Sequence, residues 1–126
     1  MTNITIPKSV KNIGEGAFYD CSGLINITIP DSVTSIEKDT FKGCKGLKKV
    51  IIPNSITSIG ALAFIDCDSL ESVIIPDSVT RIGNYAFANC FMLKDVTIPD
   101  SVTSIGYNIF GYHQRFSLSL NLFFRG

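Results

Sequence analysis

The prolines of this chain recur at a fixed interval of 23 residues. They are Pro7, Pro30, Pro53, Pro76 and Pro99. The cysteines keep the same interval, at Cys21, Cys44, Cys67 and Cys90. A unit of this length is too short to bury its own apolar face, so it must stack on its neighbours. The interval therefore restricts the chain to a solenoid of similar, stacked units.

Each unit follows the pattern I-P-x-S-[VI]-x-x-I-[GE]-x-x-[ATI]-F-x-x-C-x-x-L-x-x-[VI]-x. Its segment L-x-x-[VI]-x-I ends in alternating apolar and outward residues, which is typical of a half-buried strand. The proline that follows lacks an N–H and ends the strand pairing there. A second short extended piece is predicted where Val or Ile precedes another Ile by three residues. The A-F-x-x-C stretch predicts a helical turn or a short 3-10 segment.

Small and polar residues mark the expected turns of each unit. A serine follows each proline by two residues, and we expect its hydroxyl to bond nearby backbone amides. Gly14, Gly60, Gly83 and Gly106 follow the second extended piece, where they are expected to allow a turn. Glu37 occupies that position in the second unit.

The motif IPDSVTxIGxxAFxxCxxLxxVxI resembles the BspA-type leucine-rich repeat, also called the 23-residue or Treponema-type class. The resemblance covers residues 1 to about 110. We therefore predict an α/β fold, a right-handed leucine-rich-repeat solenoid. A parallel β-sheet is expected on one face, with short strands and helical or 3-10 turns on the other. Many proteins of this family are surface or secreted proteins implicated in adhesion to host matrix glycoproteins, and many others have no known function.

The two ends of the repeat array are expected to lack caps. Residues 1–110 are predicted to hold about five repeats, the first of which begins in mid-unit. The pattern breaks after Phe110, since His113 stands where a cysteine is expected. Residues 111–126 are predicted to be a degenerate last repeat or a tail, with a distorted strand over 116–122. Either the chain is a piece of a longer repeat protein, or it protects its ends by self-association.

Residues that could support catalysis or bind a metal are not arranged for either role in the sequence. His113 is the single histidine, and no nucleophile motif accompanies it. Cysteines 23 residues apart form a row instead of converging on one point, so we expect buried, reduced thiols and no zinc site. No phosphate-binding glycine loop is present. We predict a protein that is not an enzyme and that uses no cofactor.

Charge and hydropathy narrow the classes of partner. The eleven Lys and Arg residues balance eleven Asp and Glu residues, which disfavours nucleic acid as a partner. A lysine-rich stretch over residues 38–49 leaves polyanions as a minor alternative. No apolar run reaches about 18 residues, so no membrane span is predicted. The first residues lack the pattern of a signal peptide. The resemblance implies the cell surface or secretion, and a cytoplasmic location stays open.

The outward strand positions vary from unit to unit, which makes them the candidate binding face for a protein ligand, such as a matrix glycoprotein. The candidate residues are Lys48, Lys49, Ile51, Glu71, Ser72, Ile74, Lys94, Asp95 and Thr97. Lys48, Glu71 and Lys94 are expected to stack as a column of alternating charge, and Lys45 to meet Asp68. Ile51 and Ile74 either suit their strands or anchor an apolar side chain of a partner. We predict a protein-binding module; the alternative is a structural repeat that self-associates end to end.

Overall fold

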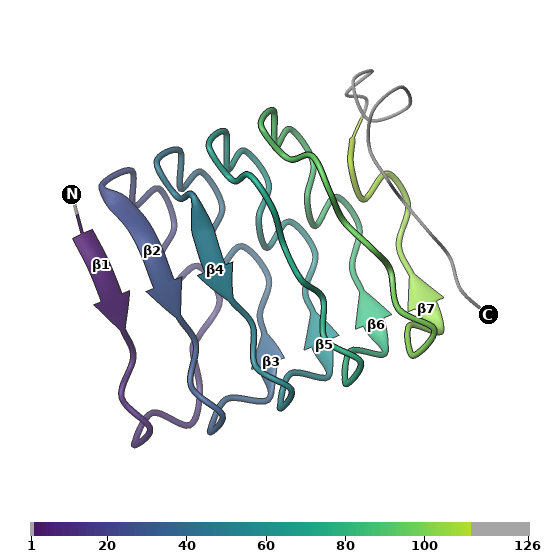
Figure 1. Ribbon diagram of the computed structural model, residues 1–126, viewed down its shortest axis with the longest axis horizontal. Coiled ribbons are helices and arrows are strands. Elements are labelled where there is room, and N and C mark those ends of the chain that lie inside the picture. The colour runs from purple at the N-terminus through teal and green to yellow at the C-terminus, as the bar shows by residue number, and fades with distance from the viewer. Residues whose placement is uncertain (1, 112–126) are drawn as a thin grey trace.

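A computed structural model describes residues 2–111 as a row of parallel coils, one for each repeat (Figure 1). Two parallel sheets run along the row, and each coil contributes to them in turn. The first sheet contains β1 (Thr2–Thr5), β2 (Leu24–Thr28) and β4 (Lys49–Ile51). The second contains β3 (Ser35–Ile36), β5 (Ser58–Ile59), β6 (Arg81–Ile82) and β7 (Ser104–Ile105). The predicted parallel solenoid is confirmed, and the second and third coils contain both predicted extended pieces as strands.

The strands pair with a register that follows the 23-residue interval. Ile27 faces Val50 across β2 and β4, and Ile36 faces Ile59 across β3 and β5. Because side chains alternate along a strand, this register places identical positions of successive repeats in columns. The predicted strand over 116–122 and His113 lie outside the described residues.

Glycine in the second sheet is required by close approach of neighbouring backbones. A Cβ atom on Gly83 would lie 2.5 Å from the backbone N of Ala61, and one on Gly60 would lie 2.6 Å from the backbone N of Lys38. Neither glycine has a positive φ. A turn does follow them, since the Ala63 N–H donates to the Gly60 carbonyl at 3.3 Å, but the two glycines are needed for the close approach and not for a left-handed backbone. They let the Gly60 N–H donate to the Ile36 carbonyl at 2.7 Å, which holds adjacent coils together.

The second sheet begins at β3, and the exception in the glycine column explains why. Glu37 stands where the other repeats carry glycine. Its Cβ would meet the backbone of the first coil if the two coils approached as closely as later coils do. Within residues 2–111, the segment 12–13 of the first coil accordingly forms no strand with β3.

The connecting segments contain turns, and no helix occurs among residues 2–111. The predicted helical or 3-10 segments, and with them the α/β class, are not confirmed. Leu62 and Asp66 both have positive φ, and so do the equivalent residues within the described part of the chain, which interrupts any helical run. Backbone N–H groups alternate in their partners: Lys42 donates to Asp39 within its own coil, whereas Phe41 donates to Ala63 in the next.

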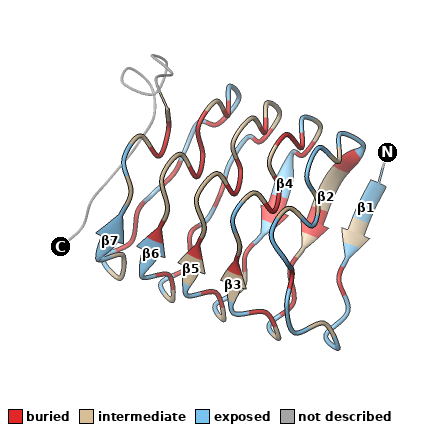
Figure 2. Ribbon diagram, turned by 180° about the vertical axis from the view of Figure 1, so that it is seen from behind, coloured by how far each residue is buried: buried red, intermediate tan, exposed pale blue. Residues whose placement is uncertain are grey.

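The core is a set of ladders that run the length of the row. Phe18, Phe41, Phe64 and Phe87 stack nearly parallel, with ring centroids 5.4, 5.1 and 5.2 Å apart. The last three of these rings are fully buried. Ile, Leu and Val residues of both sheets complete one continuous cluster. Buried positions recur at the same place in successive coils, while β1 and β7 at the two ends are largely exposed (Figure 2).

The cysteines form a ladder of hydrogen bonds. Each thiol donates to the carbonyl of the phenylalanine 26 residues earlier: Cys44 to Phe18 at 3.1 Å, Cys67 to Phe41 at 3.2 Å, and Cys90 to Phe64 at 3.1 Å. Desolvation by burial raises the pKa of Cys44 to about 11 and that of Cys90 to about 12. It also raises the pKa of Cys67. The prediction of buried thiols that act as core residues is confirmed for these three.

The serines after the prolines bond differently from the expectation. Ser32 donates to the Val10 carbonyl at 2.6 Å, and Ser55 donates to the Val33 carbonyl at 2.7 Å. The hydroxyls of Ser32, Ser55 and Ser78 therefore donate to a carbonyl of the preceding coil, and each adds a bond between coils. The buried Ser101 hydroxyl has no such partner among the described residues.

Gly83→Ala should lower the free energy of unfolding by about 1–3 kcal/mol, because the added methyl group overpacks the contact with Ala61. Gly14→Ala is the matched control, since its Cβ would meet nothing within 4 Å. Denaturant titrations of both variants measure the difference. Equal stability of the two variants would contradict the requirement for close approach.

Native thiol titration should show one reactive cysteine, Cys21, which is partly exposed. The thiolate is the reactive form, and burial with raised pKa values keeps the other three protonated at pH 8. A chromogenic disulfide reagent should therefore modify one thiol quickly and the remaining three on unfolding. Cys21→Ser should abolish the fast phase, and a second fast thiol in that variant would contradict the burial of the ladder.

Candidate functional site

The outward face of the first sheet and of its continuation over residues 72–74 and 95–97, here called the strand face, carries every predicted site residue. All of them are exposed: Lys48, Lys49, Ile51, Glu71, Ser72, Ile74, Lys94, Asp95 and Thr97. The inward neighbours Val50, Val73 and Val96 are buried. The solenoid thus brings these outward residues together in columns on one surface.

The sheet on the strand face opens between β4 and residues 72–74. Ser72 forms an isolated bridge with Asp95, but no bridge joins it to β4. In the described part of the chain, a long bond of 3.4 Å from the Glu71 N–H to the Lys48 carbonyl links the two segments here. Ile29 donates to Ile51 at 3.2 Å, yet no equivalent bond joins Ile52 to Ile74. The two segments therefore part at this point.

A hollow of about 190 Å³ lies in this opening, here called the strand-face slot. Its lining residues are Lys49, Val50, Ile51, Ile52, Ser72 and Ile74. A wider hollow of about 490 Å³, here called the acidic hollow, lies against the other side of Ile74. Its lining residues are Ser72, Val73, Ile74, Ile75, Asp77, Asp95, Thr97 and Pro99. Ile74 is 83% exposed and forms the ridge between the two hollows.

Several lining residues are absent from the sequence-based prediction. Val50 and Ile52 are core residues by pattern, and Asp77 belongs to the turn after the proline. Val50 and Ile52 reach the slot because the strands separate, and Asp77 lines the acidic hollow from the turn. The sequence pattern of the fourth repeat is as regular as that of the third. No feature of the repeat signals this separation.

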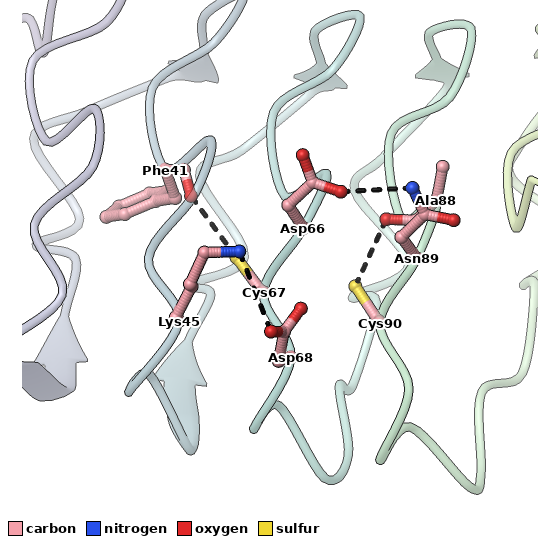
Figure 3. A network of polar contacts seen from close by, with 8 residues as sticks. All are labelled: Phe41, Lys45, Asp66, Cys67, Asp68, Ala88, Asn89 and Cys90. Carbon is pink, nitrogen blue, oxygen red and sulfur yellow. Dashed lines mark hydrogen bonds and ion pairs between the residues drawn. The ribbon is translucent and has the colours of Figure 1, made fainter.

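Charge on and beside the strand face is only partly paired. Lys45 and Asp68 form an ion pair at 3.7 Å, as predicted (Figure 3). The expected column places Glu71 between Lys48 and Lys94 through successive backbone bonds. Their side chains form no ion pair among the residues described. Such exposed pairs contribute about 0–1 kcal/mol, so packing of the coils does not depend on them.

The chemistry of the strand face changes along the row of coils. At the N-terminal end, the Asn26 amide donates to the Asn3 side-chain oxygen at 2.9 Å, and Thr5 and Thr28 stand beside them. This part is polar and uncharged. In β4 the equivalent outward positions are occupied by lysine and isoleucine. At residues 95 and 97 they are occupied by aspartate and threonine. One surface thus presents three different chemistries in sequence.

The raised pKa values of the buried cysteines make them poor nucleophiles at neutral pH. Across residues 2–111, no group of three His, Cys, Asp or Glu side chains could hold a metal ion. The same residues contain no helix that is long and apolar enough to span a membrane.

Comparison with known families agrees with this geometry. The profile of the BspA type leucine rich repeat region matches residues 1–117 in six copies. The chain belongs to the BspA-type leucine-rich-repeat family. Leucine-rich repeats are in general protein-interaction modules. No protein with a curated description matches it.

Solved structures of other repeat proteins share the fold. A leucine-rich repeat protein from T. pallidum is 32% identical with a TM-score of 0.80, over 82% of this chain and 51% of its own length. A leucine-rich repeat protein from Bacteroides ovatus is 25% identical with a TM-score of 0.73, and the match covers 98% of this chain and 42% of that protein. The pneumococcal vaccine antigen PcpA is 24% identical with a TM-score of 0.76, and the match covers 82% of this chain and 27% of that protein. This chain therefore spans about half or less of these proteins.

The backbone amide of Ile52 should exchange with solvent at least about ten-fold faster than that of Ile29, because only the Ile29 amide is bonded to a neighbouring strand. Hydrogen exchange followed by two-dimensional NMR measures both amides in one sample. Equal protection of the two would show that the sheet is closed between β4 and residues 72–74.

Proposed function

We propose that this chain is a non-enzymatic protein-binding module that engages its partner through the strand face around Ile74. The observation that carries the proposal is the exposure of two isoleucines on adjacent coils, 46% for Ile51 and 83% for Ile74. Hollows flank Ile74 on both sides. An apolar centre with a charged rim is the usual composition of a protein interface.

The contrast between inward and outward positions supports the same proposal. Inward positions repeat the same apolar residues in each coil and form the core. Outward positions change from amide to lysine, serine and aspartate along one column. Packing does not require this change, because these side chains are exposed on the strand face. Solenoids use such columns to build extended recognition surfaces.

The family resemblance supports a more specific role. It favours adhesion at the cell surface or after secretion, with a matrix glycoprotein as partner. The balance of eleven basic and eleven acidic residues is compatible with a protein ligand and disfavours nucleic acid.

End-to-end self-association is the second candidate function. Strand β1 lies at the edge of its sheet, where backbone groups are available for pairing. Phe18 stacks on Phe41 at 5.4 Å but stays partly buried, whereas Phe41 is fully buried. A second copy at this end would cover the exposed side of that ring.

The double variant Ile51→Ser and Ile74→Ser should bind at least about ten-fold more weakly to whichever member of an immobilised matrix-glycoprotein panel captures the wild-type chain. Loss of an apolar anchor at the centre of an interface accounts for a reduction of this size. Ile105→Ser is the matched control, because Ile105 is 40% exposed but lies on β7 in the second sheet.

Thermal unfolding of all three proteins confirms that they are folded. Undiminished binding by the double variant would contradict the proposed face. A folded wild-type chain that binds no member of the panel, and that elongates with concentration in light scattering, would favour self-association.

A further inference from the structure

We infer that the strand-face slot and the acidic hollow together select one kind of peptide: an extended segment with an aliphatic side chain between an acidic and a basic residue. The aliphatic side chain enters the slot beside Ile74, the acidic residue meets Lys49, and the basic residue meets Asp77 and Asp95. This inference rests on the proposed function, since it assigns the chemistry of the partner at that same face.

The slot has the size and lining for one aliphatic side chain. Its volume of about 190 Å³ is below the roughly 300–1,000 Å³ that hold a drug-sized ligand. Ile51 and Ile74 are outward residues of adjacent coils, and Val50 and Ile52 line the slot from the inward side of β4. Four of the six lining residues are thus aliphatic, so burial of an aliphatic group is favoured there.

The charges at the rim differ in sign on the two sides of Ile74. Lys49 lines the slot, with Lys48 beside it, and neither lysine forms an ion pair in the described region. Asp77 and Asp95 line the acidic hollow. A partner that crosses the ridge therefore passes from a basic rim to an acidic one. Its own charges must follow the opposite order.

The spacing of these charges fits an extended peptide. Lys49, Ser72 and Asp95 occupy one column, so Lys49 and Asp95 are two coils apart. This separation exceeds about 10 Å, because the usual strand spacing is about 4.8 Å and the first of the two gaps is open. Side chains on one face of an extended peptide recur at every second residue, and four residues span about 13 Å. An acidic and a basic residue four positions apart, with an aliphatic residue midway between them on the same face, therefore match the site.

The neighbouring column of outward residues does not favour one order of charges in the peptide over the other. Its residues, Lys48, Glu71 and Lys94, alternate in sign across the same three coils. The order of charge that a partner meets is thus set by Lys49 on one side and by the two aspartates on the other. A doubly acidic segment would meet the aspartates, and a doubly basic one would meet the lysines.

The test uses short synthetic peptides titrated into the isotope-labelled chain and followed by two-dimensional NMR. The first probe is acetyl-Gly-Glu-Gly-Leu-Gly-Lys-Gly-amide, which places its three functional side chains on one face of an extended chain. A second probe carries serine in place of leucine, a third is doubly acidic and a fourth doubly basic at the charged positions. The first probe should shift residues 49–52 and 72–77, with a dissociation constant at least three-fold below those of the third and fourth. The serine probe should give no saturable shift.

Lys49→Glu should reverse the charge preference, so that the doubly basic probe binds this variant at least three-fold better than the first probe does. Lys38→Glu is the matched control, because Lys38 is exposed and lines neither hollow. It should retain the wild-type order.

Absence of binding by the first probe, equal binding of the three charge versions, or the same change in both variants would overturn the inference. The panel experiment separates its failure from that of the proposed function. If Lys49→Glu binds the matrix glycoprotein like wild type while the double isoleucine variant does not, the strand face binds the partner and the charge-ordered peptide is wrong.

Discussion

Close approach of backbones in adjacent coils is the constraint on which the rest of the structure depends. In the turn segments alternate N–H groups donate to the next coil, as Phe41 does to Ala63, and in the second sheet Gly60 donates to Ile36. Serine hydroxyls and cysteine thiols add further bonds between coils by donating to carbonyls of the preceding coil. The glycine column shows how little space this leaves, because a single methyl group would meet the neighbouring backbone. Where Glu37 replaces glycine, the second sheet begins one coil later.

This constraint divides each repeat into a fixed and a free part. Residues that point inward must match their neighbours 23 positions away, which produces the stacked rings of Phe41, Phe64 and Phe87. Residues that point outward on the strand face contribute little to the contact between coils, so their chemistry can change. The proposed binding surface is therefore a consequence of how the core is built.

Much of the fold could be predicted from the sequence because its signal is periodic. The ladders of Phe, Cys and Ile and the positions of both extended pieces follow from the interval alone. The connecting turns could not be predicted in the same way: Leu62 and Tyr85 adopt positive φ, a conformation that these residue types do not announce. The candidate face could be predicted as a surface, including the exposure of Ile51 and Ile74. The slot could not, since it depends on where pairing between β4 and residue 72 is lost.

The most direct test of the central claim is cross-saturation NMR of the chain bound to a matrix glycoprotein that it captures. This measurement identifies the amides that lie against the partner without altering any side chain. Binding through the strand face predicts attenuation centred on residues 49–52 and 72–77, with no effect on β5, β6 and β7. Attenuation centred on the second sheet or on the edge of β1 would contradict the account.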